Sequence, residues 1–456
     1  MAFVYGAIVL FLMGIVYYFL ISNKMDKAAS AFAAGAILLF LTAIFTNTYP
    51  ELVPEAIKKI SLDELSEFVD FKTLGLLLGM MIILPFIEES GFFQFVAITV
   101  VKLSRGNFRL LFVVTSVIVA ISSAFLNNVS TVMVFVPVVL AVTETIGKNP
   151  FPYLVMIILS ANLGGAATLI GDPPNMLVGF AAEKSFNDFL VNVAPVVGIT
   201  IFTVIILLLW KEGKYFKLDA EEKVILRRFS QTNPKSQIRD KKLMAKSLLV
   251  FVGALIGFML PPSLGIDPAL VSLLAAAVLL FLLRVDSETM EKVFKKIEWG
   301  TIFFFLGMFT LVYGLEAVGV MEYLVNGLVH LFPSPIFLLL FVLWFPLLMA
   351  GLVSAVPMVM IMIPIVENII HNSSLIFSTN TGLADTLWWA LVLGACYGGN
   401  GTIVGAAANI VVSGMSQKLE RGKLTFSEYF RYSFPIVIVT GVIASLYVLF
   451  RYYIAL

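Results

Sequence analysis

Apolar stretches long enough to cross a lipid bilayer recur along this chain, and they limit its fold more than any other feature. Examples are residues 2–20, 28–46 and 193–210, none of which contains a charged residue. A transmembrane helix needs about 20 predominantly apolar residues. Only 13% of all residues are charged, whereas a soluble domain has roughly 25%. Because strands of alternating polarity, the pattern of outer-membrane barrels, are absent, we predict an all-α polytopic membrane protein.

Two glycine-rich segments inside this apolar sequence resemble each other. "GGAATLIGDPPN" (Gly164–Asn175) and "GGNGTIVGAAAN" (Gly398–Asn409) share glycines, a threonine and an asparagine without a gap. A second pattern, acid-aromatic, threonine, apolar run and Gly-Met, is shared by "VDFKTLGLLLGM" (Val69–Met80) and "IEWGTIFFFLGM" (Ile297–Met308). The two members of each pair have nearly the same separation along the chain. The sequence therefore predicts two copies of one structural unit.

The distribution of positive charge predicts that these copies have opposite orientations. They are residues 1–211 and 246–456, each with about five transmembrane helices, joined by a charged linker at 212–245. Cytoplasmic loops carry an excess of Lys and Arg, and the linker region at 211–246 is rich in both. With this arrangement, all but five of the 30 Lys and Arg residues lie on the linker side. The exceptions are Lys58, Lys59, Lys72, Lys184 and Arg451. We expect inverted repeats in a prokaryotic plasma membrane, with 211–246 cytoplasmic and both termini outside.

Each copy also contains a longer apolar segment with an interruption near its middle, at 107–147 and at 333–371. Basic residues flank both ends of the first segment, so it returns to the side it enters from, either by spanning twice or as a re-entrant hairpin. The interruption "SSAFLNNVST" (Ser122–Thr131) favours the hairpin, because polar backbone exposed to lipid is costly. The glycine-rich segments predict broken helices at 152–183 and 386–413.

The sequence Asp172-Pro173-Pro174 reads as a helix start inside the membrane, since Asp favours the N-cap and Pro the first turn. Asn127 and Asn128 similarly precede the next helical segment. Helix N-termini attract oxygen-rich and anionic ligands, and broken helices in inverted repeats indicate a transporter's substrate site. For Asp172 two interpretations stay open: a helix cap, or a carboxylate that couples transport to an ion.

Four segments resemble the ion transporter superfamily, particularly its branch of arsenite permeases, NhaD-type sodium/proton antiporters and the melanosomal P protein. They are "SAFLNNVSTVMVFVP", "NLGGAATLIGDPPN", "FIEESGFFQFVAITVVKLSRG" and "GACYGGNGTIVGAAANIV". The resemblance implies a secondary transporter with two inverted repeats, a scaffold domain, a mobile transport domain and a homodimeric assembly. Many relatives have a carboxylate at the first hairpin tip. This chain has Asn127-Asn128 there and Ser354-Ala355 at the second tip, which weakens the antiporter interpretation.

Polar and glycine residues of the interruptions are the candidate substrate contacts. They are Asn127, Asn128, Ser130, Thr131, Asn162, Gly164, Gly165, Thr168, Asn175, Ser354, Gly398, Gly399, Asn400, Thr402 and Asn409. The candidates for proton or ion coupling are Asp172, Glu88, Glu89 and Glu316. The glycines could instead serve close helix packing, and the glutamates could form structural hydrogen bonds. One cysteine and two distant histidines predict no metal site, and no cofactor is expected.

The leading hypothesis is an alternating-access carrier for a small inorganic solute, either an oxyanion or an uncharged metalloid such as arsenite, with proton coupling through Asp172. The hydroxyls of As(OH)3 could bond to Asn, Ser and Thr side chains without a fixed charge. The alternative is sodium/proton antiport, and a passive channel is a weaker hypothesis. An intramembrane enzyme is the weakest hypothesis, because "GDPP" alone is a weak peptidase signal and the sequence has no His-Glu-x-x-His and no second aspartate motif to pair with Asp172. We therefore expect no enzyme. The expected partners are the solute, H+ or Na+, the bilayer and a second copy, and no nucleic acid.

Overall fold

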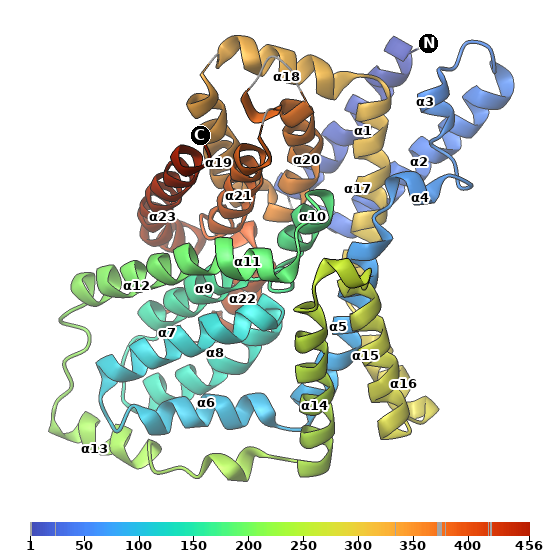
Figure 1. Cartoon of the computed structure of the whole chain (residues 1–456). Helices are drawn as coiled ribbons and strands as arrows, with labels where there is room; N and C mark the ends of the chain where they lie inside the picture. The colour runs from blue at the N-terminus through green and yellow to red at the C-terminus, as the bar shows by residue number, and fades with distance from the viewer. Residues whose placement is uncertain are drawn as a thin grey trace.

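The computed structural model describes residues 2–22, 24–332, 334–371, 376–378, 380–417, 419 and 422–456. Every regular element within these ranges is helical (Figure 1), and nine of the helices described are long and apolar enough to cross a membrane. Large apolar side chains such as Phe11, Trp210 and Leu446 are exposed on these helices, and lipid accommodates such faces far better than water does. The predicted all-α membrane fold is confirmed.

The first half of the chain contains the two helices expected at its start, the first hairpin and the first broken helix. Its elements are α1 (Ala2–Ser22), α2 (Lys27–Thr48), α3 (Glu55–Lys58), α4 (Leu65–Phe68), α5 (Phe71–Glu89), α6 (Phe92–Leu103), α7 (Phe108–Phe125), α8 (Asn128–Thr145), α9 (Phe151–Gly165), α10 (Pro173–Ala181), α11 (Phe186–Asn192) and α12 (Ala194–Lys211). Helices α7 and α8 form the hairpin, and α9 and α10 form the broken helix.

The linker contains a helix and a short 3-10 turn, and the second half repeats the order of the first. The elements are α13 (Ala220–Phe229), η1 (Pro234–Gln237), α14 (Lys241–Phe258), η2 (Pro262–Leu264), α15 (Pro268–Leu283), α16 (Ser287–Lys296), α17 (Trp299–Ala317), α18 (Val320–Leu331), α19 (Pro335–Val353), α20 (Ala355–His371), η3 (Ile376–Ser378), α21 (Thr381–Gly398), η4 (Ile403–Gly405), α22 (Ala407–Ser416) and α23 (Phe426–Ala455).

Corresponding elements of the two halves agree in length. Helices α5 and α17 each have 19 residues, and α6 and α18 each have 12. The hairpin α7–α8 corresponds to α19–α20, and the broken helix α9–α10 to α21–α22. Pro333, the first residue of the predicted second hairpin, lies outside the described residues, as do Lys418 and Arg421, which the charge pattern assigned to the linker side.

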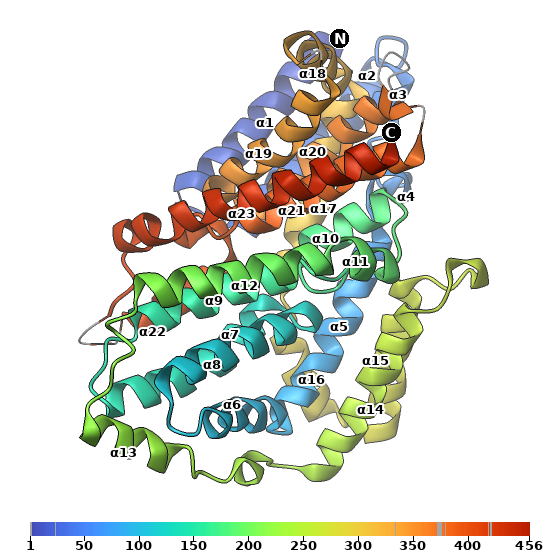
Figure 2. The ribbon, with the colours of Figure 1, turned by 60° about the vertical axis from the view of Figure 1, so that its left-hand side comes forward.

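The two halves exchange helices. Helices α1 and α2 of the first half pack against α17 of the second, and α14 and α15 of the second half pack against α5 of the first. We call these six helices the outer helices. The hairpins, the broken helices, α12 and α23 form a central bundle. In Figures 1 and 2 both termini lie towards the top and the linker helix α13 lies at the lower edge.

The glycine of the repeated Gly-Met pattern lies where outer helices of the two halves cross. Gly79 of α5 packs on the backbone of Ser272 in α15, and Gly307 of α17 packs on the backbone of Ala31 in α2. Glycine lets two helix backbones approach closely. The glycines of the repeated pattern therefore reflect the exchange of helices between the halves.

Replacing Gly307 with alanine should destabilise the protein by about 1–3 kcal/mol, because overpacking of a close contact has this typical effect. The added Cβ would lie 2.2 Å from the carbonyl oxygen of Ala31. Gly253→Ala is the matched control, since nothing lies within 4 Å of a Cβ at that position of α14. Thermal unfolding in detergent compares the two variants. Equal midpoints would contradict the close crossing of α2 and α17.

The linker packs on the first half of the chain. The Glu222 carboxylate of α13 pairs with Lys148 at 2.9 Å, directly after α8. The Tyr215 hydroxyl donates to the carbonyl oxygen of Asn149 at 2.6 Å, and η1 packs against α6. The predicted charged linker therefore also holds the ends of the first hairpin in place.

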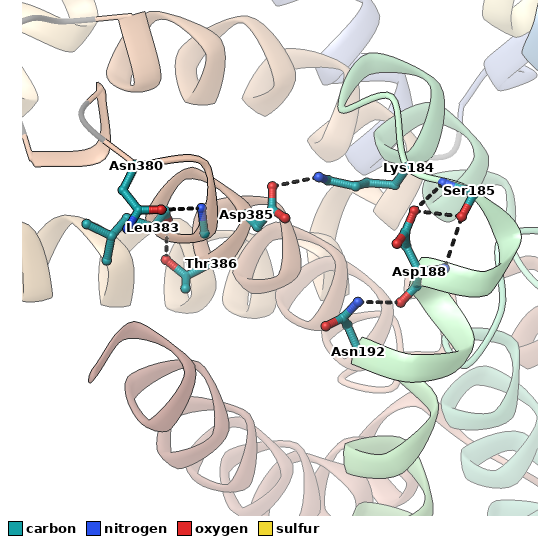
Figure 3. Close-up of polar contacts among 9 residues, drawn as sticks. Lys184, Ser185, Asp188, Asn192, Asn380, Leu383, Asp385 and Thr386 are labelled. Atoms are coloured by element: carbon teal, nitrogen blue, oxygen red, sulfur yellow. Dashed lines mark hydrogen bonds and ion pairs between the residues drawn. The ribbon is translucent and has the colours of Figure 1, made fainter. Parts of the chain in front are cut away.

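An ion pair joins the two halves at the far end of the central bundle (Figure 3). The Lys184 ammonium lies 2.7 Å from Asp385 of α21, and the two side chains are only 19% and 28% exposed. Beside this pair, the Asp188 carboxylate accepts hydrogen bonds from the backbone N–H and the hydroxyl of Ser185, at 2.8 and 2.6 Å. This capping box begins α11, so the corner after α10 is anchored to the second half.

Candidate functional site

Both broken helices are interrupted at the glycine-rich segments. The α-helix stops at 166–172 between α9 and α10, and at 399–406 between α21 and α22. A Cβ at Gly171 would lie 2.4 Å from the carbonyl oxygen of Gly165, and Gly405 is confined in the same way in the second half. These glycines are therefore required because each interruption folds back onto the end of its own helix.

Asn175 and Asn409 close the two interruptions with matching hydrogen bonds. The Asn175 amide donates to the carbonyl oxygens of Gly165 and Thr168, at 2.9 and 2.7 Å. The Asn409 amide donates to the two repeat-related carbonyl oxygens within 399–406, both at 2.8 Å. Both side chains are fully buried. Each asparagine thus provides a donor to two buried carbonyl oxygens where the helical hydrogen bonds are interrupted.

The two interruptions meet across the halves through the oxygens of the same asparagines. The Asn162 amide of α9 donates to Oδ1 of Asn409 at 2.8 Å, and also to Oδ1 of Asn400 at 3.0 Å. The Cys396 thiol of α21 donates to Oδ1 of Asn175 at 3.1 Å. Asn162 and Cys396 occupy the same position in the two copies of the glycine-rich repeat. The two contacts are therefore equivalent by the repeat, with an amide donor from the first half and a thiol donor from the second.

A threonine in each interruption anchors it to a hairpin. The Thr168 hydroxyl donates to the carbonyl oxygen of Ala124 in α7, and the Thr402 hydroxyl donates to that of Gly351 in α19. The residue that follows α19 is Ser354, whose φ of +76° is unusual for a residue other than glycine. Both hairpin tips are therefore held beside the interruptions.

A central cavity of about 90 Å³ lies between the hairpin tips and the interruptions. The N-terminal residues of α2, α8, α10, α17, α20 and α22 line it. Its charged lining residues are Lys27, Asp172 and Glu298, and polar ones include Asn127 and Ser354. Six helix N-termini give the cavity a set of partial positive charges.

The capping interpretation of Asp172 is wrong for its side chain. Asp172 occupies the N-cap position of α10, but its carboxylate makes no cap hydrogen bond. Pro173 and Pro174 have no N–H to offer, and the N–H of Asn175 bonds to the backbone oxygen of Asp172 at 3.0 Å. The carboxylate instead lies against the Asn128 side chain and lines the central cavity.

The structure divides the predicted substrate contacts into two sets. Those that line the central cavity are Asn127, Asn128 and Ser354. Those that do not line it are Ser130, Thr131, Asn162, Gly164, Gly165, Thr168, Asn175, Gly398, Gly399, Asn400, Thr402 and Asn409. In the second set Ser130 lines the larger cavity described below. The rest are buried, and the asparagines and Thr168 and Thr402 among them make the hydrogen bonds described above.

The three candidate glutamates lie away from the central cavity. Glu88 is at the end of α5, where its carboxylate pairs with Lys296 at 3.2 Å. Glu89 is exposed beside it, and Glu316 occupies the corresponding position near the end of α17. The repeat match that singled out Glu88 and Glu316 is real, but it places them near the ends of two outer helices.

Sequence reasoning missed Lys27 and Glu298 as cavity residues. Lys27 begins α2, and no motif distinguishes it from other basic residues that flank membrane helices. Glu298 could have been found, because it is the acid of the repeated acid-aromatic pattern and corresponds to Asp70. Both come from outer helices, which contribute to the site only after the two halves have packed together.

Two further cavities adjoin the central one. The first, about 260 Å³, shares Asn127, Val129, Pro173 and Glu298 with it and extends along α5 to Glu88. The second, about 330 Å³, shares Lys27, Ser354 and Ala407 and extends to the α1–α2 turn. The central cavity is therefore approached from two directions.

An all-helical membrane fold whose inverted halves bring broken helices and hairpin tips to one cavity defines the class of secondary transporters. Residues 17–394 match the family model described as "CitMHS: Citrate transporter". The chain belongs to this family, and the predicted membership of the ion transporter superfamily is confirmed.

Related proteins match most of the chain. An uncharacterized transporter of Mycobacterium tuberculosis is 34% identical over 387 residues, which cover 85% of this chain and 87% of the relative. The 46 kDa membrane protein of Mycobacterium leprae is 30% identical, with 96% and 97% covered. The P protein of Homo sapiens is 30% identical over 85% of this chain but only 54% of its own length.

A solved structure shares the fold. The YdaH transporter of Alcanivorax borkumensis, described as having an unusual topology, aligns with a TM-score of 0.60 over 93% of this chain and 98% of its own. Its sequence identity is 15%, so the similarity supports the architecture and not a shared substrate.

Proposed function

We propose that the chain carries a small oxygen-rich anion through the central cavity, coupled to protons, and that a di- or tricarboxylate such as citrate is the first substrate to test. The observation that carries this proposal is the convergence of six helix N-termini on a cavity that also contains Lys27. Helix N-termini and an ammonium group both favour carboxylate oxygens.

The partners of Lys27 support an anionic substrate. Among the described residues, Lys27 forms no ion pair, although it lies in the same cavity as two carboxylates. An ammonium group without an acidic partner at a cavity wall is available to a ligand. Arsenite, expected from the sequence, is largely uncharged as As(OH)3 and has less need of this cation. The family description names citrate, which also favours a carboxylate.

Proton coupling follows from the acids in the same cavity. Asp172 and Glu298 both line it, so a bound anion is close to two carboxylates of like charge. Protonation of either carboxylate removes part of this repulsion. Substrate and proton binding should therefore favour each other, as symport requires. Sodium/proton antiport would use Asp172 for the cation instead, and the two uncharged hairpin tips offer it no further carboxylate.

We also propose that the hairpins are re-entrant and that linker residues 211–246 are cytoplasmic. Both hairpin tips share one cavity with the interruptions of the broken helices, which supports a depth near the middle of the bilayer. Proteolysis of the linker in vesicles of known orientation tests its side, and cleavage from the outside would contradict the proposal. The homodimer implied by the resemblance stays a prediction, which light scattering of the purified protein tests.

Ligand-dependent thermal unfolding separates the candidate substrates. A ligand that binds the native state at 100 times its dissociation constant stabilises it by about 2.7 kcal/mol. We expect citrate to raise the unfolding midpoint more at acidic than at neutral pH, and arsenite and sodium to leave it unchanged. Uptake of labelled citrate into proteoliposomes should then require a proton gradient. If arsenite alone stabilises the protein and is taken up, arsenite replaces the carboxylate as the proposed substrate. If sodium-driven proton movement is the only activity observed, sodium/proton antiport replaces carboxylate transport as the proposed function.

A further inference from the structure

Glu298 makes a contact that joins an outer helix to the first hairpin tip. One carboxylate oxygen accepts a hydrogen bond from Nδ2 of Asn127 at 2.8 Å. The other accepts from the Thr301 hydroxyl at 3.1 Å. The Asn127 oxygen is already used, because it accepts from the backbone N–H of Val129 at 2.7 Å. The orientation of the Asn127 amide is thereby fixed, with its NH2 group directed at Glu298.

The repeat partner of Glu298 behaves differently. Asp70 caps α5, and its carboxylate accepts from the backbone N–H groups of Lys72 and Thr73 at 3.0 and 3.1 Å. Glu298 occupies the same N-cap position of α17 but makes no cap hydrogen bond. Its side chain is one methylene longer and reaches the hairpin tip instead. The second half thus gives up a helix cap, a favourable local interaction, for a contact between distant segments.

The contact lies on the boundary between two cavities. Asn127 and Glu298 both line the central cavity and both line the adjoining cavity of about 260 Å³ that extends along α5. We call this adjoining cavity the α5 cavity. The second hairpin tip has a comparable connection to an outer helix, from the Tyr17 hydroxyl to the carbonyl oxygen of Pro357 at 3.0 Å. Only the contact of the first tip involves a charged group.

We infer that Glu298 and Asn127 form a gate between the α5 cavity and the central cavity, and that a solute passes only when their hydrogen bond opens. Glu298 is then a positioning residue, because it holds the hairpin tip through Asn127. The inference rests on the proposed transport function. Its test needs no substrate. A negative result in that test therefore contradicts the gate, whereas a negative result with citrate contradicts the proposed substrate.

Cysteine accessibility tests the gate. The chain contains one cysteine, Cys396, which is buried and provides a low background. Val356→Cys reports on the central cavity and Ser130→Cys on the α5 cavity, since each lines only that one of the two. The 330 Å³ cavity also leads to the central cavity, and this route contributes the same labelling to every variant. Above that background, we expect Glu298→Ala to accelerate maleimide labelling of Val356→Cys about tenfold, the factor for losing one charge-assisted hydrogen bond. Labelling of Ser130→Cys should not change.

Three further variants test whether labelling depends on the hydrogen bond between Glu298 and Asn127 or on a general structural role of Glu298. Glu298→Gln keeps an acceptor for Asn127 and should label at the rate of the parent. Asn127→Asp places two carboxylates face to face and should label as fast as Glu298→Ala. Adding Glu298→Gln to Asn127→Asp restores a hydrogen bond with its polarity reversed and should slow labelling again. Equal rates in Glu298→Ala and the parent, or no recovery in the double variant, would overturn the inference.

Discussion

Asn409→Ala should lower the stability of the protein by about 3 kcal/mol or more, the largest effect expected for any single change in the central bundle. The substitution removes the side-chain donor to two buried carbonyl oxygens of the second interruption, and among the described residues only that of Thr402 keeps another donor, the Gly405 N–H at 3.3 Å. It also removes one of the two acceptors of the Asn162 amide. Each buried polar group without a partner costs about 1–3 kcal/mol. Asn175→Ala should have a similar effect, because Asn175 makes the corresponding bonds.

Thermal unfolding of the purified protein in detergent measures this effect. Asn187→Ala is the matched control, since the Asn187 side chain makes one hydrogen bond, to the carbonyl oxygen of Met259 at 2.9 Å, at an exposed site. Its loss should cost no more than about 1 kcal/mol. Asn409→Asp adds a stricter comparison, because it keeps the size and removes both donors. If Asn409→Ala unfolds at the temperature of the control, the amide does not hold the interruption together.

The expected loss of stability favours a structural role for the asparagines of the glycine-rich segments. The sequence predicted that the interruptions meet at one site and that their asparagines bind substrate. The hydrogen bonds support the meeting but assign Asn162, Asn175 and Asn409 to one another and to the backbone. Local sequence could not distinguish these roles, because a buried amide that holds an interrupted helix and one that binds a solute look alike. The partners become visible only when helices from opposite halves of the chain are packed together.

The outer helices show why part of the site escaped prediction. Apolar length, charge distribution and the internal repeat were sufficient for the all-helical fold and for the two broken helices. Lys27 carries no such signal, since it lies at a helix start where charged residues are common. Glu298 belongs to the repeated acid-aromatic pattern, but the pattern alone does not show that this acid lines a cavity. The exchange of α5 and α17 between the halves brings Glu298 to the first hairpin tip. Composition and periodicity do not report which half a helix packs against, so this information comes from the tertiary structure.

Lys27→Ala should weaken binding of a carboxylate substrate about tenfold, with little change in stability. Lys27 is the only basic residue that lines the central cavity in the described part of the chain. A hydrogen bond to a charged group contributes about 1.5–3 kcal/mol, and the exposure of Lys27 places the expected effect at the lower end of this range. Lys27→Arg keeps the charge and should retain part of the affinity.

Calorimetric titration with citrate measures this change, and Lys24→Ala is the matched control. Lys24 lies in the turn just before α2, lines the 330 Å³ cavity but not the central one, and donates to the Tyr18 hydroxyl at 3.1 Å. Its removal alters the net charge equally but leaves the central cavity intact, so affinity should change little. A general effect of charge would weaken binding in both variants and would be screened by salt. Unchanged citrate affinity in Lys27→Ala would contradict the proposed role of Lys27, because the helix N-termini alone would then provide all the attraction for the substrate.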